Sequence, residues 1–518
     1  MNDFLNLHFD SESGKYLAKG SNRVSYGNKT KEALNDGVFL SWEWDGSNLQ
    51  INSDSYGAYP AFYSLDKRNF CIATTLHGLS ASTNTLNFDL PALSLYLKFG
   101  YFIGGRTPFK EIQKIRPHRK LVIREGKYIA VDCGVEPPKL SDNVNSASAR
   151  SEFISRFSYA MEKRLSLVSQ EFSHPLSGGR DSRHILLEMY RQKRLPAKTF
   201  TVRLSKPDDP LGDEAVARQL SEVCGVQHST LLFPKFSAHS AELVKNFCCG
   251  LTGSEGAWMT ASLPLLAQYP CAIFDGIGGD VLAAGLFIRN NWQSLAQEGR
   301  WDELAVTLVR DLSSNRDQKR VNRLASKIFG VPETAFSEEA AIECVRDELD
   351  LYKNFHNPVT AFFFYNRTAG VIAASSFGMY QCVDQIHAPF LDRNVAGFLL
   401  SLPESMFADH QFHSRAIAEA YPDFATIPYT GKKNVSPIVD THVAKFKAAL
   451  DLISYTGRQL PSKFLEVIYW LVDCNFKKNK RTLTRHSLVV LLETLRLSKG
   501  DPAAYNNALQ DKYFKFYE

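Results

Sequence analysis

The chain lacks the sequence features that mark secreted and membrane-spanning proteins. Its nine cysteines are scattered, odd in number and never arranged as Cys-x-x-Cys, so they predict free thiols in a reducing compartment rather than a disulfide framework. No uncharged apolar run reaches the roughly 18 residues of a membrane-spanning helix. Residues 1–4 do not begin a basic segment followed by an apolar one, which argues against a signal peptide. These absences predict a cytoplasmic protein without a membrane partner.

An excess of charge of one sign is also missing. The formal net charge is +5 over 518 residues, which is too small to indicate a nucleic-acid partner. We interpret the basic run at residues 476–487 as solvated chain. Hydrophobic residues make up 44% and charged residues 22%, as in ordinary globular proteins. At roughly 100–200 residues per domain, the length allows about two to four domains.

The N-terminal part of the chain has the alternating pattern of β-strands. Residues 38–44 and 49–52 flank Asp45-Gly46, a dipeptide that favours a tight hairpin turn. A helix is expected over residues 90–99, because Asp89 can cap it and Pro91 suits its first turn. Two further strand pairs are expected, at residues 59–63 with 70–74 and 120–124 with 128–132.

The segment 136–150 is rich in Pro, Ser and Asn and predicts a linker between a domain of residues 1–135 and a domain of residues 151–518. After the linker, helices and strands alternate, which predicts an α/β fold with a doubly wound parallel sheet. Beyond about residue 290 the pattern is mostly helical. The expected helices are 151–169, 182–192 and 213–224, and the expected strands are 171–176, 198–202, 229–233 and 272–274.

A glycine-rich motif, Ser177-Gly178-Gly179-Arg180-Asp181-Ser182, lies between an expected strand and an expected helix. Glycines let the backbone approach phosphates, and a helix N-terminus presents free N–H groups and a positive dipole to them. Ser177 and Ser182 add hydroxyl donors, whereas Asp181 beside phosphates is suited to a Mg²⁺ ligand. The Gly-Lys-Ser/Thr of a Walker A loop does not follow. The motif therefore predicts a site for the pyrophosphate part of ATP.

The segment HPLSGGRDSRHILLE around this motif resembles the SGGxDS loop of the PP-loop ATP pyrophosphatases. That superfamily includes asparagine synthetases, GMP and NAD synthetases and tRNA-modifying ligases. Its members cleave ATP between the α and β phosphates and activate a carbonyl oxygen as its adenylate. The resemblance implies that ATP is bound by Ser177, Gly178, Gly179, Asp181 and Ser182, together with Val202 in the next strand.

A second glycine-rich turn, Asp275-Gly276-Ile277-Gly278-Gly279-Asp280, follows the expected strand 272–274. It resembles the second loop of the asparagine synthetase family, written SGxGxDE. The resemblance implies that Gly276 and Gly278 bind ATP and that Asp280 is a second Mg²⁺ ligand beside Asp181. Related β-lactam synthetases carry a tyrosine within this loop. Ile277 stands in that place here, which argues against their ring closure.

The segment Pro389-Phe390-Leu391-Asp392 resembles the PFLD segment of the same family, where it is mostly structural. The family has an active-site glutamate shortly before it. Gln385 stands there in this chain, and an amide cannot act as a general base. Either Asp384 replaces the glutamate through a one-residue slip, or the second step runs differently.

A family lysine downstream of PFLD stabilises the adenylate and the developing charge. Lys432 or Lys433 is the matching candidate, although two adjacent loop lysines are also compatible with simple solvation.

Residues 42–63 and 100–123 resemble the glutaminase-like domain of asparagine synthetases, which implies an N-terminal-nucleophile α+β sandwich. A working glutaminase of this class needs a cysteine directly after the initiator methionine. Asn2 occupies that position, so we expect no glutamine hydrolysis. Lasso-peptide cyclases and β-lactam synthetases have lost the same activity, and both form an amide with an amine already on the substrate.

The chain is thus identified as a relative of the class B asparagine synthetases. The resemblance implies an ATP- and Mg²⁺-dependent ligase that adenylates a small-molecule or peptide carboxylate, couples it to an amine or ammonia, and releases AMP and pyrophosphate. A homodimer is possible, as among relatives. The alternatives are a peptide macrocyclase of natural-product maturation, another PP-loop chemistry such as nucleotide modification, and a catalytically silent nucleotide-binding scaffold.

Overall fold

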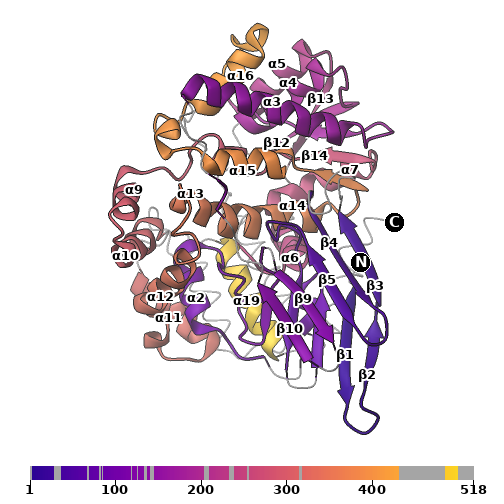
Figure 1. Cartoon of the computed structure of the whole chain (residues 1–518), viewed down its shortest axis with the longest axis vertical. Helices are drawn as coiled ribbons and strands as arrows, with labels where there is room; N and C mark the ends of the chain where they lie inside the picture. Colours follow the sequence, from indigo (N-terminus) through magenta and orange to yellow (C-terminus); the bar gives the residue numbers. More distant parts are fainter. Residues whose placement is uncertain are drawn as a thin grey trace, which may run out of the picture.

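The computed structural model places two antiparallel sheets towards one end of the molecule and a parallel sheet with helices at the other (Figure 1). It describes residues 3–27, 37–66, 69–80, 83, 86–117, 119–124, 127–132, 137–139, 145–203, 209–232, 238–253, 256–313, 318–430 and 485–499.

The first antiparallel sheet has the strand order β2-β1-β7-β6-β8 and the second has the order β10-β9-β5-β4-β3. The three expected hairpins are confirmed, as β4 with β5, β6 with β7, and β9 with β10. Strands β1, β2, β3 and β8 were not expected. The bounds are β1 Phe4–Asp10, β2 Lys15–Gly20, β3 Arg23–Gly27, β4 Phe39–Trp44, β5 Leu49–Ser53, β6 Phe62–Leu65, β7 Asn69–Ala73, β8 Ile112–Lys114, β9 Arg119–Arg124 and β10 Lys127–Asp132.

Helix α2 (Leu90–Phe99) has the bounds that its capping residues predict. The Asp89 side chain accepts a hydrogen bond of 3.0 Å from the Ala92 N–H, and Pro91 lies in the first turn. Gly100 ends the helix with φ at +78°, a left-handed conformation that glycine adopts at little cost.

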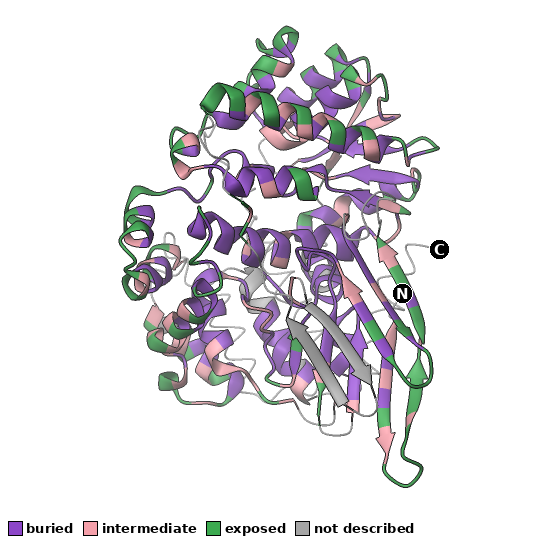
Figure 2. Ribbon diagram, in the orientation of Figure 1, coloured by how far each residue is buried: buried purple, intermediate pink, exposed green. Residues whose placement is uncertain are grey.

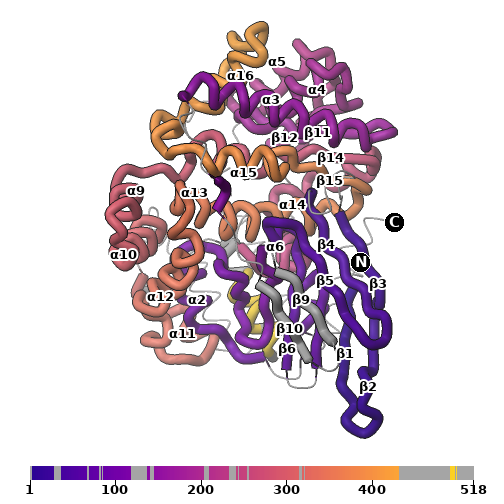
Figure 3. Tube along the Cα trace, in the orientation of Figure 1, coloured from indigo at the N-terminus to yellow at the C-terminus, as the bar shows by residue number. Residues whose placement is uncertain are grey.

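The parallel sheet has the order β13-β12-β11-β14-β15, with every neighbouring pair parallel. This confirms the α/β fold. Strands β12 and β13 lie on one side of β11, and β14 and β15 lie on the other. The direction in which successive strands are added therefore reverses between β11 and β14. Strand β15 was not expected, because it has three residues and lies more than 100 residues after β14 in the chain (Figure 3). The bounds are β11 Ser173–Pro175, β12 Lys198–Arg203, β13 Gln227–Leu232, β14 Ala272–Phe274 and β15 Gln385–His387.

Helix α3 (Ser146–Leu165) begins five residues earlier than its pattern predicts and takes up the end of the expected linker. The cause is Asn145, whose side chain accepts a hydrogen bond of 2.9 Å from the Ser148 N–H and caps the helix. The boundaries of the two expected domains, and the comparison with an N-terminal-nucleophile sandwich, stay predictions.

The remaining described chain is mostly helical, as expected. A π-helix, Phe364–Ile372, follows α13. The α-helices are α1 Leu76–Ser80, α4 Arg180–Arg191, α5 Asp213–Val223, α6 Ala238–Cys249, α7 Leu263–Leu266, α8 Gly279–Leu282, α9 Asn290–Gln297, α10 Trp301–Leu312, α11 Gln318–Phe329, α12 Glu338–Leu349, α13 Pro358–Phe363, α14 Ala373–Met379, α15 Arg393–Ser401, α16 Phe412–Ala420 and α19 Arg485–Lys499.

One continuous hydrophobic core joins the two ends of the molecule. It includes Leu5 and Ile72 of the first sheet, Trp42 of the second, and Phe274 at the parallel sheet. Figure 2 shows the buried residues running through the middle of the molecule. None of the helices in the described ranges is both long and apolar enough to cross a membrane.

The cysteines in the described ranges are free, as expected. Six are buried and Cys382 is half-buried, and the adjacent Cys248 and Cys249 both lie in the core.

Candidate active site

The two glycine-rich turns meet at the carboxyl edge of the parallel sheet. One follows β11 and the other follows β14, so they flank the point where the winding reverses, which is where open α/β sheets bind ligands. A Cβ added at Gly276 would lie 2.8 Å from Asp181 Cβ, and one at Gly279 would lie 2.5 Å from Asp181 Oδ1. Only glycine therefore lets the second turn pack against Asp181.

The first turn is held by its own serines. The Ser177 N–H donates to Ser182 Oγ over 3.0 Å, the two hydroxyl oxygens are 3.0 Å apart, and the Gly179 N–H donates to Ser177 Oγ over 3.2 Å. Gly179 caps helix α4 and supplies no side-chain acceptor. The N–H groups of the first helical turn are therefore left for an anion, as a phosphate site requires.

Three carboxylates lie on these turns. Burial and the neighbouring Asp181 raise the pKa of Asp280 to about 6, while Arg367 acts in the opposite direction. Burial also raises the pKa of Asp275, and Asp181 adds to that rise. Asp275 is already paired, since it accepts hydrogen bonds of 3.1 Å from the Ile277 N–H and 2.7 Å from Ser376 Oγ.

The crowding of like charges at Asp181 and Asp280 fits a divalent cation, because a bound cation would relieve their mutual repulsion. Mg²⁺ is usually held by one or two carboxylates together with substrate phosphates rather than by an all-protein cage. The described ranges contain no group of three or more His, Cys, Asp and Glu side chains placed to hold a metal.

Two histidines that sequence reasoning did not assign to the site lie beneath the turns. The His174 ring lies between the two turns, with Nε2 2.9 Å from the Ser182 carbonyl oxygen and Nδ1 3.1 Å from the Phe274 carbonyl oxygen. A neutral ring carries one N–H, so it donates to only one of these two oxygens. Burial lowers the pKa of His174 to about 4. On the other side, His413 Nδ1 of α16 lies 3.4 Å from Asp181 Oδ1. Nothing in the local sequence around either histidine signals such a role.

The segment Ile427–Thr430 covers the first turn. The Thr430 N–H donates to the Gly178 carbonyl oxygen over 3.1 Å. Asp213 Oδ1 accepts from both the Gly178 N–H (3.1 Å) and Thr430 Oγ1 (2.7 Å). A Cβ at Gly178 would overlap Thr430 Oγ1, so the close packing needs glycine. Lys432 and Lys433 follow this segment and lie outside the described residues, so their role stays a prediction.

Two arginines of α4 hold the same segment from below. The Arg183 guanidinium donates to the Ile427 carbonyl oxygen over 2.9 Å and lies 4.0 Å from the centre of the Tyr429 ring. Arg180 lies 5.6 Å from that ring and donates to Ser414 Oγ over 2.5 Å.

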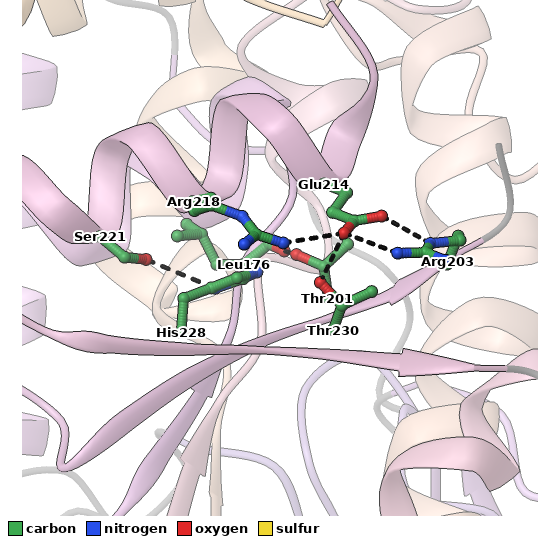
Figure 4. Close-up of polar contacts among 8 residues, drawn as sticks. All are labelled: Leu176, Thr201, Arg203, Glu214, Arg218, Ser221, His228 and Thr230. Atoms are coloured by element: carbon green, nitrogen blue, oxygen red, sulfur yellow. Dashed lines mark hydrogen bonds and ion pairs between the residues drawn. The ribbon is translucent and has the colours of Figure 1, made fainter. Parts of the chain in front are cut away.

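Val202 is the next-to-last residue of β12 and lies buried at the same carboxyl edge as the turns. Thr201 beside it donates through Oγ1 to the Leu176 carbonyl oxygen and so joins β12 to the start of the first turn (Figure 4).

Glu214 in the first turn of α5 fixes the ends of β12 and β13. It accepts hydrogen bonds of 2.6 and 2.8 Å from Arg203, 2.9 Å from Arg218 and 2.9 Å from Thr230, and Figure 4 shows these side chains converging on it. The hydrogen bonds, that from Arg203 above all, lower the pKa of Glu214 to about 2. The strand ends at this side of the site are thus held by an ionised network.

The structure corrects the expectation that Asp384 replaces the family glutamate. Gln385 pairs with Ala272 at the start of β14, and the Asp384 N–H donates to the Pro270 carbonyl oxygen over 2.6 Å. Asp384 is therefore exposed at the amino edge of the sheet, whereas both turns lie at the carboxyl edge. Three strand residues span about 10 Å, so the fold separates Asp384 from the turns.

Asp392 of the PFLD segment is structural. It is 1% exposed, accepts hydrogen bonds from Arg164 Nη1 over 2.7 Å and from the Asn394 N–H over 3.0 Å, and lies 3.0 Å from Lys163 Nζ. The carboxylate thus joins α3 to the start of α15.

These features define a class: an α/β protein with an anion-binding crevice at the winding reversal and paired carboxylates beside it. A family model described as asparagine synthase matches residues 152–415, just over half of the chain. The chain belongs to the asparagine synthase family, whose members are ATP-dependent amide-bond ligases. The matched range contains both turns and His413. No curated protein matches the chain.

Proposed function

We propose that this protein uses ATP to adenylate a carboxylate and then couples the activated acyl group to an amine or ammonia, without hydrolysing glutamine. The observation that carries the proposal is the packing of Asp181 against Gly276 and Gly279, which puts a phosphate-type turn and a second carboxylate turn into one crevice. Family membership supports the ligase class.

The first half-reaction needs positioning and charge neutralisation more than covalent help from the protein. The first-turn N–H groups of α4 and the hydroxyls of Ser177 and Ser182 would hold the β and γ phosphates. Asp181 and Asp280 would hold Mg²⁺, which when bound offsets the negative charge of the pyrophosphate. A carboxylate oxygen of the substrate then attacks the α phosphorus, and the bond to the β-phosphate oxygen breaks.

In the second half-reaction an amine nitrogen attacks the acyl carbon, AMP leaves with the bonding electron pair, and the nitrogen loses a proton. Asp384 is too far from the crevice to take that proton. Lys432 and Lys433 remain the proposed cations beside the adenylate, because they follow Thr430, whose N–H is bound to Gly178.

The nitrogen donor is proposed to be ammonia or an amine of the substrate. Asn2 offers no thiol for glutamine hydrolysis. Incubation with glutamine should release no glutamate. Glutamate release at the rate of amide formation would contradict this part of the proposal.

The test is the fate of ATP. Incubation with ATP, Mg²⁺ and panels of small-molecule and peptide carboxylates should give substrate-dependent AMP and pyrophosphate, and ATP–pyrophosphate exchange should appear without the amine. Release of ADP and phosphate would overturn the proposal. A peptide macrocyclase would give a product lighter than its precursor by one water.

The variant Asp280→Ala separates a ligase from a silent scaffold. A ligase loses both Mg²⁺-dependent ATP binding and turnover in this variant. A scaffold binds ATP without turnover in the wild-type protein across the whole substrate panel.

A further inference from the structure

A π-helix, Phe364–Ile372, lies beside the second glycine-rich turn. It packs against helix α8, which carries Asp280. Asn366 Nδ2 donates to the Phe362 carbonyl oxygen over 3.0 Å, so this buried acceptor keeps a partner within the wide helical turn. Stretches of π-helix are rare and frequently occur at functional sites. The π-helix therefore brings its side chains next to the turn that carries Asp280.

Arg367 of this π-helix lies on the side of Asp280. Its guanidinium carbon is 5.6 Å from the centre of the Phe287 ring, and Phe287 follows α8 in the chain. The Phe287 ring is stacked on Phe363, with 3.8 Å between ring centres, so the surface beneath Arg367 is fixed. Burial raises the pKa of Asp280, whereas the positive charge of Arg367 lowers it. Arg367 is half-buried, so part of its side chain reaches solvent.

Two other arginines near the crevice serve a different part of the protein. Arg180 donates to Ser414 Oγ. Arg183 is 2% exposed and donates to the Ile427 carbonyl oxygen over 2.9 Å. Both therefore hold the segment that covers the first turn, whereas Arg367 lies at the second turn.

The N-terminal part of the chain holds a different face of the π-helix. Lys114 Nζ, at the end of β8, donates to the Gly370 carbonyl oxygen over 2.6 Å. The Gly104 N–H donates to Asn366 Oδ1 over 2.8 Å. Lys114 is 5% exposed, so water competes little for its hydrogen bond. Asn366 and Gly370 lie on either side of Arg367 in the chain, so these two contacts set the place of Arg367.

We infer that Arg367 binds the β and γ phosphates of ATP, and that Lys114 is a positioning residue for Arg367. The inference rests on the proposed function, in which Asp280 holds Mg²⁺ beside those phosphates. A guanidinium offers two parallel N–H donors to phosphate oxygens, which a single ammonium group cannot match. Arg367 would also stabilise the departing pyrophosphate, because the electron pair of the broken bond goes to the β-phosphate oxygen.

The test compares two ligands, pyrophosphate with Mg²⁺ and AMP, which lacks the β and γ phosphates. Each is titrated by calorimetry into the full-length protein without a carboxylate substrate. Arg367→Met keeps an unbranched stem over Phe287 but removes the donors. It should weaken pyrophosphate binding by at least about tenfold, because hydrogen bonds to charged groups contribute that much. Affinity for AMP should stay within about twofold of the wild type.

Arg367→Lys keeps the charge without the planar fork, so it should lose less pyrophosphate affinity than Arg367→Met. Arg156→Met is the matched control, because Arg156 also lies over an aromatic ring, that of Phe398, but on helices that carry neither turn. It should bind both ligands like the wild type.

Unchanged pyrophosphate affinity in Arg367→Met would overturn the inference. An equal loss for pyrophosphate and AMP would show a merely structural role and would overturn it too. If Arg367→Met does not fold, Arg367→Lys decides: a loss for pyrophosphate alone supports the inference, and unchanged affinity overturns it. A wild-type protein that binds neither ATP nor pyrophosphate in Mg²⁺ would overturn the proposed function instead.

Lys114→Met tests the positioning role. It should weaken pyrophosphate binding by at least about threefold, yet cause no further loss in an Arg367→Met background, because Lys114 acts through Arg367. Additive losses, or an unchanged Lys114→Met, would contradict this role. If Lys114→Met does not fold, Asn366→Leu takes its place in the same comparison, because it removes the hydrogen bond from Gly104.

Discussion

At the residue scale, the three aspartates of the crevice differ in how far their charge is compensated. Asp275 accepts hydrogen bonds from both a backbone N–H and Ser376, whereas the Asp181 side chain is 24% exposed and so reaches solvent. Asp280 accepts a hydrogen bond of 2.8 Å from the Val281 N–H, yet burial and Asp181 still raise its pKa to about 6. The electrostatic cost of bringing these carboxylates together is therefore concentrated at Asp280.

This cost predicts that Asp280→Asn stabilises the metal-free protein at neutral pH. The pKa of Asp280 is raised from 3.8 to about 6 in the folded protein, so folding favours its neutral form. The stability that this group contributes is complete below about pH 4, is lost between about pH 4 and pH 6, and stays lost above that. The loss is at most about 3 kcal/mol, because one pKa unit corresponds to 1.36 kcal/mol.

Chemical denaturation in EDTA provides the measurement. The variant should be more stable than the wild type at pH 7.5, and the difference should shrink towards pH 4.5. Asp423→Asn, at an exposed aspartate, is the matched control and should show little change. A less stable Asp280→Asn at pH 7.5 would contradict the assigned charge crowding.

At the element scale, short strands that end in glycine turns place the functional groups. Strands β11 and β14 have three residues each, so each turn begins almost at once after a buried strand. The turns can then approach each other only because Gly276 and Gly279 leave room for Asp181. The close approach of the two carboxylate turns thus depends on glycines, which have no side chain.

Gly276→Ala tests this packing. Its Cβ would lie 2.8 Å from Asp181 Cβ and 3.2 Å from the backbone nitrogen of Ser182, so one turn must move. Overpacking of this kind costs about 1–3 kcal/mol, and the displaced Asp181 should lower affinity for Mg²⁺–ATP. Denaturation and nucleotide titration provide the two measurements.

Gly397→Ala is the matched control, because Gly397 lies in helix α15 with nothing within 4 Å of an added Cβ. It should leave ATP binding unchanged and gain up to about 1 kcal/mol from the better helix propensity of alanine. An unaffected Gly276→Ala would show that the turns are less tightly packed than described.

At the scale of the whole molecule, the N-terminal sheets and the parallel-sheet region form one packed body. They share the hydrophobic core, and polar contacts cross between them at several points. Arg116 pairs with Glu348 of α12 at 2.6 Å, Lys114 Nζ donates to the Gly370 carbonyl oxygen over 2.6 Å, and the Gly104 N–H donates to Asn366 over 2.8 Å. The N-terminal part therefore contributes core packing and polar contacts to the whole molecule.

The Arg116–Glu348 pair predicts a non-additive result. Arg116→Met leaves Glu348, whose side chain is 6% exposed, without its cation and should cost about 3 kcal/mol. The double variant Arg116→Met, Glu348→Met should cost less than the two single changes together, because it leaves neither charge unpaired. Chemical denaturation of the wild type, the two single variants and the double variant gives the four free energies of unfolding that this comparison needs. Arg300→Met, at an exposed ion pair, should change stability little, and additive single effects would contradict the prediction.

Local signals in the sequence determined much of this protein. The cap at Asp89 predicted both ends of α2, the Asp45-Gly46 turn predicted the β4–β5 hairpin, and the βα alternation predicted the parallel sheet. The motif from Ser177 to Ser182 by itself indicates a phosphate site. Each of these signals acts within a few residues, because caps, turns and strand alternation depend on near neighbours in the chain.

Only the tertiary structure decided which distant groups meet. It placed His413, more than 200 residues downstream, behind Asp181, and it brought the Gly276 turn against that same carboxylate. It also places Asp384 away from the two glycine-rich turns, since β15 runs parallel to β14 and leaves Asp384 at the opposite edge of the sheet. The physical reason is that packing of the whole core sets the direction and order of the strands. The position of a residue in the chain therefore does not reveal which distant residues it will contact.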